Sequence, residues 1–267
     1  MFYHYTDSNG LFGMLSNQEI WLTDRRYLND KNEGKDIYKI VDKLLQEHPR
    51  LNKESASHIK NLIHRFENKC SDYTASFSRA PDLLSQWRGY CPPEGGYCIG
   101  FKGLSRDTTD IHDKSNESLF HWLDNPKDCV YEHDEKVKLV SYILETIVDL
   151  IDSDLDEDKA GNVGRMLASN FQRARMIFKD SNFSEEREVR LLLQPHENVT
   201  PFIRCKGNLL VPYFKVSFDS EIVEEIIIGP STNSDLAEEG IRVFLRGLGD
   251  NYQHVRVKHS QIPYRNV

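Results

Sequence analysis

The sequence lacks any apolar run long enough to cross a membrane. Its longer apolar runs, such as Leu191–Leu193 and Ile226–Ile228, span only a few residues, whereas a membrane-spanning helix needs roughly 18 or more. The first residues, Met1–His4, contain no basic segment followed by an apolar stretch, so no signal peptide is expected. A membrane-spanning chain is excluded, and we expect a cytoplasmic protein.

Cysteine is scarce and follows no metal-binding pattern. The five cysteines are widely spread, odd in number and free of any CxxC spacing, which is typical of free thiols in a reducing compartment. Cys91 and Cys98 could approach His121 or His133, but this spacing matches no established zinc motif. We therefore predict no metal site.

An excess of positive charge is also missing. The chain has 34 lysines and arginines against 42 aspartates and glutamates, a net charge of −8. A dedicated nucleic-acid-binding domain carries the opposite balance, although an enzyme can still contact RNA or DNA through a local basic strip. The hydrophobic fraction of 39% and charged fraction of 28% exclude a disordered or fibrous chain.

Strands are predicted near both ends of the chain, with helices inserted between them. This order favours an α+β fold in one domain over residues 1–267. Too few helical crossovers separate the late strands for a doubly wound parallel sheet. The hydrophobic periodicity predicts strands at 4–8, 19–23, 73–78, 97–101, 187–193, 209–212, 213–218, 224–228 and 254–258, and helices at 36–48, 59–66, 137–151, 163–177 and 234–248.

Several polar and aromatic stretches are not explained by packing alone. Each one separately has a structural interpretation, such as a turn, a helix cap or a solvated strand edge. Together they supply a histidine, a serine pair, aromatic rings, two arginines and a glutamate pair, a set suited to binding a nucleotide with an aromatic leaving base. The stretches are Tyr3–Thr6, Leu28–Glu33, Ser76–Ser78, Gln86–Tyr90, Gly96–Phe101 and Glu185–Arg190.

These stretches, in this order, resemble the successive blocks of domain-of-unknown-function family 2971, a bacterial family, over nearly the whole chain. The blocks read Tyr3-His4-Tyr5-Thr6, Leu28-Asn29-Asp30-x-x-Glu33, Ser76-Phe77-Ser78, Gln86-Trp87-Arg88-Gly89-Tyr90, Gly96-x-Cys98-Ile99-Gly100-Phe101, Glu188-x-Arg190 and Ile226-Ile227-Ile228-Gly229-Pro230. The family is similar in layout to the ADP-ribosyltransferase superfamily, and members appear among toxins and phage-defence systems.

The resemblance implies an ADP-ribosyltransferase-like mixed or antiparallel β core with inserted helices, and NAD as a substrate. It also implies a macromolecular acceptor, either RNA, DNA or protein, and a neutralising antitoxin as a further partner. His4 and Thr6, with Tyr5 between them, occupy the place of the first-strand motif that contacts the adenosine ribose.

The later blocks of the resemblance supply the catalytic groups. Glu188 takes the place of the late glutamate, and Glu186 completes a Glu-x-Glu pair. The middle position stays open between a serine motif, Ser76 and Ser78, and a tyrosine, Tyr90 or Tyr97. A first-strand histidine beside a Glu-x-Glu pair combines features of two subclasses, so the type of residue modified stays open.

The chemistry gives each role a physical reason. Breaking the nicotinamide–ribose bond builds an oxocarbenium-like cation, which a carboxylate such as Glu188 stabilises as it forms. Glu186 would orient or deprotonate the acceptor. Aromatic rings, Trp87 or Tyr90, would stack on nicotinamide, and an arginine, Arg88 or Arg190, would pair with the pyrophosphate.

Two other functions are open at this stage. A magnesium-dependent nuclease would use Asp30, Glu33, Glu186 and Glu188 as ligands, although the residue two positions after Glu188 is an arginine rather than the lysine of many nucleases. A noncatalytic sensor or interaction module is the other alternative. The transferase hypothesis predicts that His4, Trp87, Arg88 and Glu188 meet in one cleft.

Overall fold

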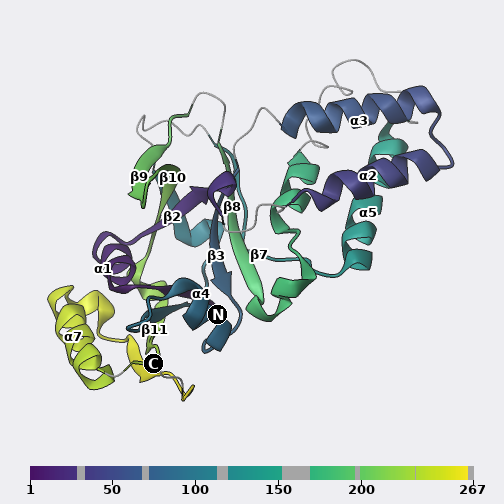
Figure 1. The fold of residues 1–267 in the computed structure, drawn as a ribbon. Coiled ribbons are helices and arrows are strands. Elements are labelled where there is room, and N and C mark those ends of the chain that lie inside the picture. The colour runs from purple at the N-terminus through teal and green to yellow at the C-terminus, as the bar shows by residue number, and fades with distance from the viewer. Residues whose placement is uncertain are drawn as a thin grey trace.

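The computed structural model describes residues 1–28, 34–67, 72–112, 120–151, 169–195, 199–231 and 233–263 (Figure 1). The strands are β1 (Phe2–Thr6), β2 (Glu19–Asp24), β3 (Tyr73–Ser78), β4 (Tyr97–Phe101), β5 (Thr109–His112), β6 (Phe120–Leu123), β7 (Lys127–Asp128), β8 (Glu188–Pro195), β9 (Phe202–Lys206), β10 (Leu209–Phe218), β11 (Val223–Ile228) and β12 (Arg256–His259). The helices are α1 (Ser8–Asn17), α2 (Asp36–Glu47), α3 (Lys53–Glu67), α4 (Leu84–Tyr90), α5 (His133–Ile151), 169–177 and α7 (Ser234–Gly247).

All twelve strands belong to one mixed sheet, which forks at β3. One edge of β3 pairs with β8 over its whole length. The other edge pairs with β1 at Ser78 and with β2 at Tyr73 and Thr74. One branch therefore continues from β1 through β4 and β11 to β12, and the other from β2 through β10 to β9 and β5.

The two branches curve around one hydrophobic core. Phe101 on β4 and Phe218 on β10 belong to different branches, yet their ring centroids are 5.4 Å apart. Tyr73 on β3 likewise meets Phe214 on β10 at 4.6 Å. We call the sheet face that carries these rings the inner face. Leucines and isoleucines of α1 and α7 complete its core.

The helices of the middle of the chain form a second hydrophobic cluster beside the sheet. α2, α3, α5 and the helix at 169–177 pack their apolar faces against one another, with Ile40, Ile59, Leu144 and Phe171 buried between them. Figure 1 shows these helices to one side of the strands rather than wrapped around them. The apolar faces of these helices, which the sequence periodicity predicts, therefore pack mainly against one another.

The predicted α+β arrangement is confirmed, with strands from both ends of the chain in one sheet. β1 from the N-terminal third pairs with β4, β3 pairs with β8 from the C-terminal third, and β11 pairs with the other edge of β4. Among the described residues, no helix is both long and apolar enough to span a membrane.

Candidate functional site

The predicted serine motif and glutamate pair lie against each other on the outer face of the sheet. In the antiparallel β3–β8 pair, Ser78 is opposite Glu188 and Ser76 is opposite Arg190. The Ser78 hydroxyl donates to the carbonyl of Glu186 at 2.8 Å. Ser76, on the same face, lowers the pKa of the Glu188 carboxyl group. Residues more than 100 positions apart in the sequence thus form one polar cluster.

Lys179 holds the two carboxylates together. Its ammonium donates to Glu188 Oε2 at 2.7 Å and also to Glu186 Oε2. Arg190 adds a second cation, with its Nε 2.8 Å from Glu188 Oε1 and its Nη1 donating to the carbonyl of Met176. Sequence reasoning missed Lys179, because it lies just beyond a helix and carries no motif of its own.

Burial and charge act in opposite directions on this cluster. Burial raises the pKa of Glu188 above its usual value, and the Lys179 ammonium opposes that shift. Burial alone would lower the pKa of Lys179, but the carboxylates of Glu188 and Glu186 raise it above its usual range. Lys179 therefore stays protonated at neutral pH and favours the ionised form of Glu188.

The cluster is open to solvent at Glu186. The Glu186 side chain is 14% exposed, compared with 5% for Glu188. Tyr90, which is exposed at the end of α4, donates its hydroxyl to Glu186 Oε2 at 3.4 Å. Between the two glutamates, Arg187 adopts a left-handed conformation with φ 46°. This turn from the 3₁₀ helix Ser181–Glu186 into β8 lets both carboxylates reach one ammonium.

α4 connects the cluster to a small cavity. The Trp87 ring packs edge-on against Tyr5 at 4.7 Å, and its Nε1 donates to Asp82 at 2.7 Å. Tyr5 in turn accepts from the Leu83 amide and donates to the Ala80 carbonyl. Trp87 and Tyr5 thus fix α4 on β1. The cavity, of about 210 Å³, is lined by Trp87, Arg88, Cys91, Pro92, Pro93, Gly95, Gly96 and Pro230.

His4 and Thr6 belong to the inner face instead. Tyr3 is opposite Ser78 in the β1–β3 pair and therefore shares the face of Glu188, so the alternation of a strand points His4 to the other side. The His4 ring packs against Phe77 at 5.6 Å, and its Nδ1 donates to the carbonyl of Ser76 at 2.9 Å. Burial lowers the pKa of His4, so it is neutral.

The structure consequently does not bring His4 and Glu188 into one cleft. The His4 ring satisfies a backbone carbonyl of β3 near the fork of the sheet, between the β1 pair at Ser78 and the β2 pair at Thr74. A bonded histidine of this kind has a structural role. Most of the other predicted site residues do lie near Glu188. Four of them surround it, namely Ser76, Ser78, Glu186 and Arg190, and three are on the adjoining α4, namely Trp87, Arg88 and Tyr90.

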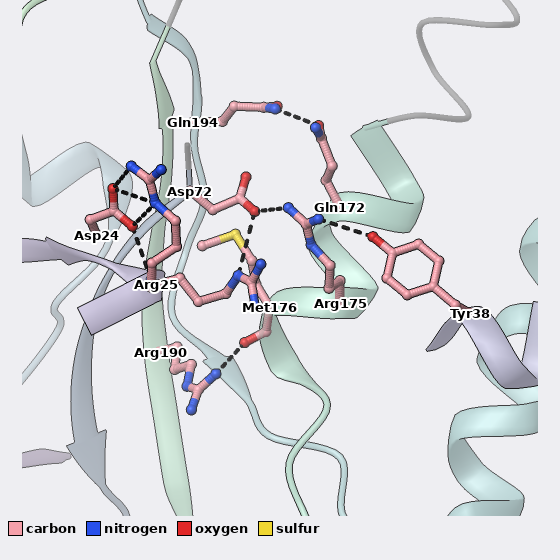
Figure 2. Close-up of polar contacts among 10 residues, drawn as sticks. Asp24, Arg25, Tyr38, Asp72, Gln172, Arg175, Met176, Arg190 and Gln194 are labelled. Carbon is pink, nitrogen blue, oxygen red and sulfur yellow. Dashed lines mark hydrogen bonds and ion pairs between the residues drawn. The ribbon is translucent and has the colours of Figure 1, made fainter. Parts of the chain in front are cut away.

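A second buried polar network extends the cluster along β3 and β8 (Figure 2). Arg175 pairs with Asp72 and donates to the Tyr38 hydroxyl at 3.1 Å, while Gln194 donates to Gln172. Burial raises the pKa of Asp72, and Arg175 opposes the shift. We call this boundary between the helix at 169–177 and the outer face of β3 and β8 the polar seam. No sequence motif indicated it.

The polar seam is incompletely bonded. Among the described residues, Asp72 Oδ1, Thr74 Oγ1, Gln172 Nε2 and Arg175 Nε are buried without a hydrogen-bond partner. Figure 2 shows Gln194 on β8 and Asp72 directly before β3, whereas Gln172 and Arg175 come from the helix. The helical cluster therefore meets the sheet here through charges and amides rather than through an apolar core.

One comparison with known proteins bears on this site. Residues 86–191 match a family model described as a protein of unknown function, DUF2971. The matched segment includes Tyr90, Lys179, Glu186, Glu188 and Arg190, and ends within β8. His4, Ser76 and Ser78 lie before it. No curated protein and no solved structure matches the chain.

The residues of the nuclease alternative are only partly described. Asp30 and Glu33 lie outside the described residues. Within the described ranges, no three His, Cys, Asp or Glu side chains are grouped so that they could hold a metal ion. At Glu186 and Glu188, the position between the carboxylates is taken by the Lys179 ammonium.

Proposed function

We propose that this protein is an NAD-dependent ADP-ribosyltransferase whose site is the Lys179 cluster at the junction of β3, β8 and α4, and that His4, on the other face of the sheet, takes no part in it. The proposal depends chiefly on one observation, the meeting of Ser76 with the Glu186–Glu188 pair around Lys179. Glycosyl transfer needs a preorganised carboxylate beside a sugar cation. The exposed edge at Glu186 and Tyr90 offers a place for that sugar.

The burial of the two glutamates supports an exchange of the roles expected for them. Glu186 is the more exposed carboxylate, so we assign it the hydrogen bond from the ribose 2′-hydroxyl. Glu188, held by Ser76, Arg190 and Lys179, is a positioning residue that fixes the ammonium and, through it, Glu186. Because the Glu186 carboxylate is held in place before the reaction, the site need not reorganise as positive charge develops on the ribose.

The proposed reaction is a substitution at ribose C1′. The bond between ribose C1′ and the nicotinamide nitrogen breaks, and nicotinamide departs with the electron pair. A nucleophile of the macromolecular acceptor donates its lone pair to C1′ and loses its proton to water. Tyr90, at the exposed end of α4, would stack on nicotinamide, and Arg88, at the α4 cavity, would pair with the pyrophosphate.

Two features support transfer over metal-dependent hydrolysis. A magnesium site needs carboxylate oxygens free to bind the metal, whereas Glu186 and Glu188 share a lysine and Glu188 is further paired with Arg190. A sugar hydroxyl, in contrast, needs only one remaining lone pair of Glu186. A bacterial toxin or defence effector, acting on nucleic acid or protein and restrained by an antitoxin in its host, is the biological setting we propose.

The test measures nicotinamide release and transfer of labelled ADP-ribose from NAD to RNA, DNA and protein of a bacterial lysate. Glu186→Gln keeps the shape of the side chain but removes its charge, so we expect turnover to fall about 10²- to 10³-fold with little change in NAD affinity. Glu239→Gln, at an exposed position of α7, is the matched control.

Two outcomes would overturn the proposal. Wild-type turnover in Glu186→Gln would remove the cluster from the reaction. Failure of the wild-type protein to bind NAD or release nicotinamide with every acceptor class would exclude the activity itself. Weaker NAD binding with unchanged turnover in Glu186→Gln would count with the first outcome, because it would place Glu186 in binding alone.

A further inference from the structure

The outer face of the other branch of the sheet carries a row of aromatic rings. Trp21 on β2 lies 4.5 Å from Tyr213 on β10, with the ring planes tilted by 33°. The ring of Phe202 on β9 lies 5.7 Å from the Tyr213 ring, so Tyr213 contacts both of the other rings. Register places all three on one face, because Phe202 is opposite Tyr213 and Lys215 is opposite Trp21. Trp21 is 37% exposed.

Cations lie over these rings. The Arg204 guanidinium is 5.4 Å from the Trp21 ring and 5.7 Å from the Tyr213 ring, and it donates to the Thr23 hydroxyl at 2.7 Å. The Lys215 ammonium is 5.3 Å from the Phe202 ring. Lys206, two positions beyond Arg204 on β9, shares this face and is exposed. We call these rings and cations the aromatic face.

The local charge is opposite to that of the whole chain. Arg204, Lys206 and Lys215 share this face with Glu19, which pairs with Lys215 at 2.9 Å. The protein as a whole carries a net charge of −8. A positive surface on an acidic protein, interleaved with planar rings, is the arrangement that binds single-stranded nucleic acid: phosphates pair with the cations and bases stack on the rings.

We propose that the aromatic face binds single-stranded nucleic acid. Trp21 is the stacking platform, because it is the exposed ring of the row. Arg204 and Lys206 contact successive phosphates along β9, and Lys215 contributes after exchanging its partner Glu19. Alternate residues of a strand lie nearly 7 Å apart, a spacing that suits neighbouring phosphates of an extended strand. This binding requires no turnover of NAD, so it stands apart from the transferase proposal.

The experiment is fluorescence anisotropy with labelled oligo(U) and oligo(dT), which distinguishes RNA from DNA. We expect binding at 50 mM salt that weakens about 20-fold at 200 mM, since three phosphate contacts give a log–log slope near −2. Trp21→Ala should weaken binding by about 5- to 100-fold. Tyr142→Ala removes an aromatic ring that is 73% exposed on α5, away from this face, and serves as the control.

A second variant keeps the test valid if Trp21→Ala fails to fold. Lys206→Glu, at an exposed position, should weaken binding and reduce the magnitude of the salt slope by about 0.7 or more. Absence of binding to both oligonucleotides at 50 mM salt overturns the proposal. So does equal affinity of wild type and Lys206→Glu, or competition by poly-glutamate as strong as that by oligo(U), which would identify an acidic peptide as the partner.

Discussion

Individual cysteine side chains differ sharply in exposure and in the pKa of the thiol, and therefore in reactivity. Burial raises the pKa of Cys91 to about 12 and the pKa values of Cys98 and Cys129 well above their usual range. Cys205 on β9 is exposed. Since the thiolate is the reactive form, we predict that iodoacetamide at pH 8 alkylates Cys205 more than about 100-fold faster than these three thiols.

Peptide mass spectrometry after timed alkylation measures this difference. Cys205→Ser should leave Cys91, Cys98 and Cys129 unmodified over the same period. Rapid labelling of Cys91 in the folded protein would contradict the raised pKa of its thiol, which donates to the carbonyl of Thr6 at 3.4 Å.

At the scale of elements, the contact between the helix at 169–177 and β3 depends on one buried ion pair. The side chains of Asp72 and Arg175 are 1% and 3% exposed. Removing one partner leaves an incompletely compensated charge, so we expect Arg175→Leu to lower the free energy of unfolding by about 3–5 kcal/mol. Replacing both, as Asp72→Leu with Arg175→Leu, should recover much of this loss.

Urea unfolding of the single and double variants measures the coupling. Arg242→Met, which breaks an exposed pair with Glu238 on α7, is the control and should cost only about 0.3–0.5 kcal/mol. A cost for Arg175→Leu as small as this control would mean that the polar seam contributes little to holding the helical cluster on the sheet.

The same elements show what the sequence could predict. Strong periodicity located α2, α5, α7 and the strands β3, β4, β8 and β11 to within a few residues. The two strands predicted at 209–212 and 213–218 are one strand, β10, because Pro212 lacks only a donor and β10 continues through it. α4 and the short strands β5, β6, β7 and β9 were not predicted, since tertiary pairing rather than periodicity determines them.

The candidate site was predictable only in part, for a similar reason. A Ser-x-Ser and a Glu-x-Glu pattern can be read from the chain, and their meeting depends on the β3–β8 register. The face on which His4 lies depends on the β1–β3 register, which a single sequence does not reveal. Lys179 and Arg175 were missed because a buried cation can be recognised only when the carboxylate that it pairs with has been located in the fold.

At the scale of the whole molecule, two hydrophobic clusters are joined across the polar seam. The inner core of the sheet and the core of the helical cluster share no residue. The Asp72–Arg175 pair joins the start of β3 to the helix at 169–177 (Figure 2), and Lys179, just beyond that helix, pairs with Glu188 on β8. The candidate site thus occupies the boundary between two separately packed bodies of side chains, the kind of place where ligand sites are commonly found.

Tyrosines and a cysteine on both faces of the sheet have raised pKa values, so we expect the free energy of unfolding to fall at alkaline pH. Burial raises the pKa of Tyr3 on the outer face and of Tyr252 in the inner core to about 12, and that of Cys91 to about 12. In the unfolded chain these groups ionise near 10 for tyrosine and about 8.5 for cysteine. The folded state therefore retains protons that the unfolded state has lost.

The sign follows directly from this difference in bound protons. The stabilisation is complete below the unfolded pKa values and is lost as pH rises towards 12, by about 1.4 kcal/mol per pH unit for each group that is titrating only in the unfolded state. We expect urea unfolding to show a free energy that falls from about pH 8.5 upward and more steeply above about pH 10, when the tyrosines join. Cys91→Ser removes one thiol and should make the decline between pH 8.5 and 10 shallower, while Tyr3→Phe should reduce the slope above pH 10. A stability that stays constant or rises between pH 8 and 11 would show that these groups ionise in the folded protein as readily as in the unfolded chain.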